Sequence, residues 1–174
     1  MLVISGGQTL SALASPGYII KNPEQMVNKF TITEAEQAAD TLELWHHEKI
    51  SELKTFLKDY DMTSISTSEL RIVGRRLFES DVINSRALLM FSEGIKALDD
   101  KGRQTNHDAK FNAIALFNER LEEQIDFFEK NPRIARSDGA ADYLQGMVRT
   151  NHVINALAYF VKSSKSELSI DEQA

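Results

Sequence analysis

Glu43 and His46, in the segment Glu-Leu-Trp-His-His-Glu, have the residue types and the spacing of metal ligands. On a helix, side chains three positions apart lie on one face and can bind the same ion, as the Glu-x-x-His pairs of di-iron helical bundles do. Such a centre also needs a second pair of this kind and two more glutamates, but no glutamate stands three residues before His107 or His152. We therefore expect Trp45 and His46 to pack at the edge of an apolar helix face. A metal-binding helical-bundle enzyme that uses Glu43 and His46 is the first alternative.

A second segment, residues 57–78, could form a calcium-binding loop. Its later half, Ile-Ser-Thr-Ser-Glu followed by an apolar helix, resembles the step from loop to exit helix in the EF-hand family, with Glu69 as the twelfth loop position. The earlier half departs from that family, because the first, third and fifth loop positions lack the expected oxygen ligands and hold Lys58, Tyr60 and Met62. Ser66 and Glu69 also match a capping box, which satisfies backbone N–H groups at a helix start. The segment therefore predicts a capped corner between two helices, and no cofactor.

Three arginines, Arg71, Arg75 and Arg76, fall on one face of the helix that follows this corner. Together with the next segment they could form a helix-turn-helix that binds DNA. That next segment is mostly apolar, whereas a recognition helix presents polar and basic groups to the bases and phosphates. The formal net charge of −6 also repels nucleic acid. We expect the arginines to contact an acidic protein partner or to form surface ion pairs, and a DNA-binding regulator is the second alternative.

Two groups of polar residues lie on the later predicted helices. Asn151 and Asn155 are one turn apart on a mostly apolar side of the last helix. We expect them to hydrogen-bond between helices, or alternatively to line a binding groove. The helix before it carries enough carboxylates for general acid–base chemistry, but they fall opposite its apolar stripe and predict a solvated acidic face without a catalytic role. These carboxylates are Glu119, Glu122, Glu123, Asp126 and Glu129.

Helical periodicity governs the chain beyond residue 30. Apolar residues three and four positions apart, together with capping signals, predict an all-α fold of about five helices in a compact, bundle-like domain. Their expected ranges are about 34–58, 66–80, 84–98, 107–130 and 140–163. We expect one helical domain over residues 31–163, a disordered tail over 164–174 and a flexible N-terminal arm over 1–30. Within the arm, two β-prone patches could pair as a short hairpin: Leu2–Ile4 and Tyr18–Ile20.

The composition is that of a soluble globular domain. The 174 residues are 42% hydrophobic and 26% charged, and no apolar run approaches the ~20 residues of a membrane helix. The absence of cysteine excludes disulfides and thiolate metal sites. The start lacks the basic region of a secretory signal. We therefore expect a cytoplasmic protein with no membrane partner, and export by a signal-less route stays open.

The lack of a coherent catalytic set predicts a protein-interaction module rather than an enzyme. A broad apolar surface on the last helix and an uncharged stretch of the arm, which could order on a partner, favour this interpretation. A bacterial adaptor, a secretion-linked chaperone or an exported effector would each fit. The partner could be another protein or a second copy of the chain.

Overall fold

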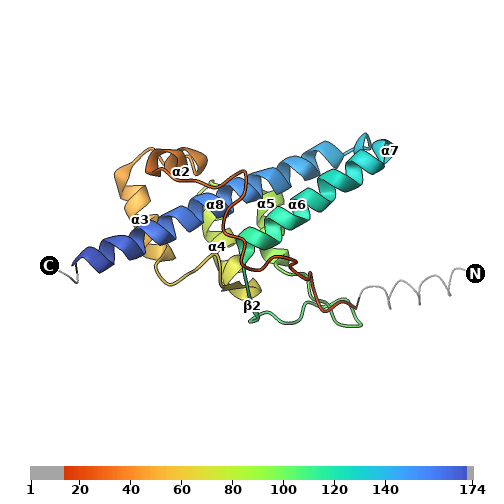
Figure 1. Cartoon of the computed structure of the whole chain (residues 1–174), viewed down its shortest axis with the longest axis horizontal. Helices are drawn as coiled ribbons and strands as arrows, with labels where there is room; N and C mark the ends of the chain where they lie inside the picture. The colour runs from red at the N-terminus through yellow and green to blue at the C-terminus, as the bar shows by residue number, and fades with distance from the viewer. Residues whose placement is uncertain (1–13, 172–174) are drawn as a thin grey trace, which may run out of the picture.

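The computed structural model describes residues 14–171. Within this range the chain is mostly helical, with one small antiparallel strand pair (Figure 1). The expected helical packing is therefore confirmed in its general form, although the described residues form seven helices rather than about five. Their bounds are Ala35–Thr41 (α2), His47–Leu57 (α3), Thr67–Glu79 (α4), Ser85–Glu93 (α5), Ala113–Lys130 (α6), Pro132–Ala135 (α7) and Ala140–Asp171 (α8).

Two helix–loop–helix units form one part of the fold, α3 with α4 and α5 with α6. Strand β1 (Ile65–Ser66) precedes α4, strand β2 (Lys110–Phe111) precedes α6, and the two strands pair antiparallel with Ile65 opposite Phe111. This pairing joins the loops of the two units and holds the starts of α4 and α6 next to each other. Ile65, as a β-branched residue, suits the strand and is fully buried there.

Helix α8 is the central element of the fold. It runs antiparallel to α6, to which the short α7 connects it, and it also contacts α2, α3 and α5 (Figure 1). The two helix–loop–helix units therefore pack on one long helix as well as on each other. Its buried apolar residues, among those described, are Ala140, Met147, Val153, Ile154, Ala156, Leu157, Phe160 and Val161.

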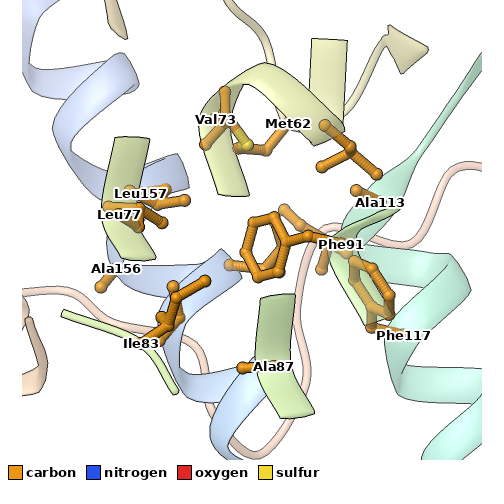
Figure 2. Close-up of a cluster of buried hydrophobic side chains, with 14 of the residues drawn as sticks. Met62, Val73, Leu77, Ile83, Ala87, Phe91, Ala113, Phe117, Ala156 and Leu157 are labelled. Atoms are coloured by element: carbon orange, nitrogen blue, oxygen red, sulfur yellow. The ribbon is translucent and has the colours of Figure 1, made fainter. Parts of the chain in front are cut away.

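Phe91 of α5 lies in the middle of the core, among side chains from α4, α6 and α8 (Figure 2). Its ring is fully buried, with its centroid 6.0 Å from that of Phe117 on α6. Gly74 on α4 permits this packing, because a Cβ at that position would lie 2.7 Å from the Phe91 Cβ. Truncating a buried phenylalanine to alanine typically costs ~3–5 kcal/mol, so Phe91 contributes strongly to the stability of the core.

The single helix expected over about 34–58 is interrupted, so that prediction was wrong. Helix α2 ends in a Schellman motif, in which the Leu44 N–H donates to the Ala39 carbonyl at 2.9 Å. Glu43 occupies the position of this motif that needs a positive φ, and its φ is 56°. Glycine is the usual residue there, so the sequence contains no ordinary stop signal at this point. As a result, Glu43 and His46 lie in a loop and do not share a helix face.

Three other helix bounds also differ from the expected ones. Helix α5 ends earlier, at the positive φ of Gly94, and α6 begins later, where the Asn112 side chain accepts a hydrogen bond from a backbone N–H of the first turn. Helix α8 continues beyond residue 163 to Asp171, into the segment expected to be a disordered tail. An ion pair of 3.0 Å between Lys54 and Glu167 links this part of α8 to α3.

The described part of the N-terminal arm, residues 14–30, lies against the helices (Figure 1). Ser15 and Leu98 exchange two backbone hydrogen bonds, of 2.9 and 2.7 Å. Further along, the buried carboxylate of Glu119 on α6 accepts two backbone hydrogen bonds, each of 2.8 Å, from the N–H groups of Lys21 and Asn22. Side-chain and backbone contacts therefore tie this segment to the domain.

The hairpin suggested for the arm is not formed by the described residues. No strand covers Tyr18–Ile20, and the Tyr18 N–H instead donates to the Ile95 carbonyl at 2.7 Å. The other suggested strand, Leu2–Ile4, lies outside the described residues.

Candidate functional site

A groove of about 810 Å³ lies between the N-terminal segment and the C-terminal half of α8. Four parts of the chain line it: residues 26–33, the loop before β1, the first turn of α6 and residues 155–166 of α8. The groove is thus a concave surface built from segments far apart in the sequence. Half of its lining residues are apolar, namely Met26, Val27, Ile32, Met62, Ile114, Ala158, Tyr159 and Val161.

The exposure of the lining side chains changes from the inside of the groove to its edge. Met62 and Ile114 are 1% and 3% exposed and belong to the core. Met26 and Val27, by contrast, are 59% and 72% exposed although both are apolar. Exposed apolar side chains beside a concave surface are typical of sites that a partner covers.

The segment that carries Met26 and Val27 is held in place by a tight turn. The Asn28 N–H donates to the Thr31 hydroxyl at 2.7 Å, and the Phe30 N–H donates to the Asn28 Oδ1 at 2.8 Å. The Phe30 ring packs edge-on against the His152 imidazole of α8, with 4.5 Å between ring centroids. Just before the turn, the Asn112 amide donates at 2.9 and 2.8 Å to the carbonyls of Pro23 and Gln25. This side of the groove is therefore attached to α6 and α8.

The His152 side chain acts as an aromatic packing partner for this turn. Burial lowers the pKa of its imidazole, and the nearby positive charges of Arg149 and Lys29 lower it further. The ring is therefore mainly neutral at neutral pH, and Phe30 packs against an uncharged ring.

Three charged side chains line the groove: Asp61, Lys162 and Lys165. The Lys165 ammonium lies 3.3 Å from the Asp61 carboxylate, and Thr63 donates to that carboxylate from its backbone N–H and its hydroxyl at 2.9 and 2.7 Å. Burial raises the pKa of Asp61, but these hydrogen bonds and Lys165 together lower it below its usual value. Asp61 is therefore ionised at neutral pH, and the two lysines leave the lining with a net positive charge.

Glu69, which the EF-hand resemblance would make a calcium ligand, is bonded within the chain. Its carboxylate accepts a hydrogen bond of 2.8 Å from the Ser66 N–H, which completes the expected capping box. The Lys110 ammonium on β2 lies 2.5 Å from both carboxylate oxygens. Burial raises the pKa of Glu69, but the bonds from Lys110 and Ser66 outweigh this effect and lower it. The positive charge next to the Glu69 carboxylate is therefore the ammonium group of Lys110.

The part of the chain that the structure describes contains no group of three or more His, Asp or Glu side chains placed to hold a metal ion. Glu43 and His46, the candidate ligands, are exposed in the loop between α2 and α3.

Trp45 in the same loop is 72% exposed, so the expectation that it packs at a helix edge was wrong. It lines a hollow of about 420 Å³ together with Leu53 and Arg76.

Arg71, Arg75 and Arg76 lie along α4 as the sequence predicts. Arg71 is partly buried and its Nε donates to the Ser92 carbonyl at 3.0 Å, whereas Arg75 and Arg76 are exposed. Within residues 14–167, none of the three arginines forms an ion pair. They line a shallow hollow of about 490 Å³ with Phe56, Ser68, Ile72 and Glu79.

Helix α5, which a helix-turn-helix would use for recognition, packs between α4 and α8. Its buried side chains include Ala87, Met90 and Phe91, and its exposed ones are Ser85 and Leu89. A recognition helix needs exposed polar and basic groups to reach bases and phosphates. The geometry of α5 therefore gives the DNA-binding alternative no support.

Two carboxylates of α6 differ from the solvated acidic face that the sequence predicts. Glu119 is only 7% exposed and accepts the two backbone hydrogen bonds from the arm described above. Glu123 accepts hydrogen bonds from the Tyr18 hydroxyl at 2.9 Å and the Lys21 ammonium at 2.7 Å. Burial raises the pKa of Tyr18, and its contact with Glu123 raises it further. These two carboxylates anchor the arm, but of the five only Glu119 is buried: Glu123 is exposed, as are Glu122, Asp126 and Glu129.

Asn151 and Asn155 take different positions. Asn151 is fully buried, and its amide donates to the Phe117 carbonyl of α6 at 3.0 Å, so it bonds between helices as expected. Asn155 donates to the Asn151 carbonyl at 2.8 Å and also lines the groove. Lining a groove was the alternative expected for Asn155, but the part played by residues 26–33 was not predicted, because their path across α8 has no local sequence signal.

Comparisons with models of protein families, with curated protein sequences and with solved structures give no significant match. Among the described residues, no helix combines the length and the apolar character needed to cross a membrane. What can be inferred about function therefore comes from the groove and from the charges around the molecule.

Proposed function

We propose that this protein is an interaction module that binds a segment of a partner protein in the groove between residues 26–33 and α8. The observation that carries the proposal is the volume of the groove, about 810 Å³, with the exposed Met26 and Val27 at its edge. Amphipathic helices and short extended peptides bind in apolar grooves of this kind. The proposal assigns the chain no reaction.

Covering Met26 and Val27 supplies part of the binding free energy. Complete burial of an apolar side chain of this size contributes ~1.5–3 kcal/mol, and the two are still largely exposed in the free protein. The turn at Asn28 and the anchor at Asn112 already hold this segment in place. A partner therefore meets a largely formed surface, and little ordering of the segment opposes binding.

The polar rim determines how a partner can be oriented. Thr31, Thr63 and Lys162 line the groove beside its apolar residues, so a bound segment can form hydrogen bonds as well as apolar contacts. An adaptor, a secretion-linked chaperone or an exported effector would each use such a site. Self-association through the groove is the other form that this function could take.

Selection from a displayed library of random peptides tests the proposal. The wild-type chain, the variant Val27→Asp and the control Ile19→Asp would each be immobilised. Ile19 is 78% exposed on the same arm but does not line the groove, so both variants add one carboxylate to an exposed apolar site. We expect peptides that bind the wild type and Ile19→Asp but not Val27→Asp. If no selected peptide depends on Val27, the proposal is wrong.

A further inference from the structure

A second surface lies on α4 and shares no lining residue with the groove. It consists of Arg71, Ile72, Arg75 and Arg76 with the neighbouring Phe56 of α3, and we refer to it as the arginine face. Its α4 residues recur at intervals of three and four positions, so they form one continuous stripe along the helix. The hollow along this stripe has a volume of about 490 Å³.

The arginine face combines positive charges that are not held in ion pairs with an exposed apolar side chain. None of its arginines forms an ion pair within residues 14–167, although the chain as a whole has a net charge of −6. Ile72 stands among them with 53% of its surface exposed. The Arg76 guanidinium lies 6.0 Å from the centre of the Phe56 ring. This cation–π contact favours an extended Arg76 side chain that lies over the ring.

We propose that the arginine face binds an acidic, amphipathic helical segment of a partner protein. Carboxylates one helical turn apart would pair with Arg75 and Arg76, since guanidinium groups form bidentate hydrogen bonds with carboxylates. An apolar side chain between those carboxylates would cover Ile72 and Phe56. Arginine at the centre of an interface, beside apolar residues, is the composition typical of binding hot spots.

The charges around the face favour a peptide over a nucleic acid. Glu79 stands at one end of the face itself. Arg76 also lines the neighbouring hollow, which Trp45, Glu52 and Asp81 line as well. A continuous phosphate backbone would be repelled by these groups, whereas a helix with a few carboxylates on one side can avoid them.

The test uses two fluorescent helical peptides and measures their binding to the intact chain by anisotropy. One peptide carries a phenylalanine with glutamates one turn before and after it, and the other carries glutamines at the same positions. The test variant is Arg75→Glu with Arg76→Glu. The control is Arg133→Glu with Arg136→Glu, which makes the same change in net charge on the exposed α7 region. A thermal unfolding curve checks that both double variants remain folded, and Ile72→Ala provides a variant without a charge change.

We expect the glutamate peptide to bind the wild type at least about tenfold more tightly than the glutamine peptide. The Arg75/Arg76 variant should lose about tenfold or more in affinity, Ile72→Ala should lose a smaller factor, and the control should stay within about twofold. The proposal is overturned if the glutamate peptide does not bind, if both peptides bind equally, or if the control loses as much as the test variant. It is also overturned if a duplex or single-stranded oligonucleotide binds this face and the glutamate peptide cannot displace it.

Discussion

Gly94 and Gly139 show how the surroundings of a single residue set the cost of a substitution. Both have a positive φ, of 50° and 81°. A Cβ on Gly94 would collide with the buried Thr67 side chain at the start of α4, whereas a Cβ on Gly139 would have no atom within 4 Å. Substitution of either glycine therefore forces a side chain onto a positive φ, but only at Gly94 does it also cause a steric clash.

We predict that Gly94→Ala lowers the free energy of unfolding by about 3 kcal/mol, because strain and overpacking add. Gly139→Ala should lower it by only about 1 kcal/mol, because strain acts alone. Equilibrium unfolding in urea measures both values. If both variants lost the same free energy of unfolding, Gly94 at the end of α5 would not lie as close to Thr67 of α4 as the structure shows.

The ion pair between Glu69 and Lys110 predicts a pH-dependent stability. Glu69→Gln keeps the capping box but removes the ion pair, and it should cost about 0.5 kcal/mol at neutral pH because both side chains are partly exposed. The pKa of Glu69 is lower in the folded chain than in the unfolded chain. The ion pair therefore stabilises the folded chain fully at a pH above the unfolded pKa, and this stabilisation is lost as the pH falls through the folded pKa.

Unfolding curves of the wild type and Glu69→Gln should therefore differ at neutral pH and converge in acid, below the usual glutamate pKa of 4.5. Glu122→Gln, at an exposed position of α6, is the control and should show no such pH dependence. A difference between wild type and Glu69→Gln that persists in strong acid would contradict the ion pair as its source.

At the scale of helices, the sequence predicts elements well where the stop and start signals are local. The capping box at Ser66 and Glu69 identifies the start of α4, and the structure has both of its hydrogen bonds. The end of α2 was missed because Glu43 takes the positive φ that glycine usually takes. The candidate metal pair of Glu43 and His46 depended on an unbroken helix there, so this one unpredicted turn also changes the interpretation of the site.

The Schellman turn at the end of α2 gives a test of this account. Glu43→Gly should raise the free energy of unfolding by about 0.5–1 kcal/mol, because glycine adopts a positive φ without strain. Glu48→Gly, in the first turn of α3, is the matched control and should lower it by about 1 kcal/mol. Thermal unfolding of the two variants gives both signs. Destabilisation by Glu43→Gly would indicate that α2 and α3 form one helix after all.

At the scale of the whole molecule, long-range contacts decide what local patterns cannot. The strand pair that joins the two helix–loop–helix units and the course of residues 14–33 across α6 and α8 both involve residues far apart in the sequence. Asn155 was named from its spacing alone, but only the packed chain places it in the same groove as Met26 and Val27. Fold class could therefore be predicted from periodicity, whereas the residues that line the groove together with Asn155 could not.

The joined loops also predict how the whole chain responds to calcium. Lys110 pairs with Glu69, the carboxylate that the EF-hand resemblance would use, and Lys165 pairs with Asp61 in the loop before β1, so both carboxylates already have positive partners. Millimolar calcium should leave the thermal unfolding midpoint unchanged relative to a sample with chelator. A rise in the midpoint with calcium but not with magnesium would contradict this account.

The most direct test of the groove as a binding site is photo-crosslinking in the cells that produce the protein. A photoreactive phenylalanine would replace Val27 at the groove or, as the control, Ile134 on α7, which is 47% exposed. We predict a discrete cross-linked partner, or a cross-linked dimer of the chain, from position 27 and not from position 134. The absence of any specific cross-link at position 27, or the same products from both positions, would contradict the proposal that this groove binds a protein.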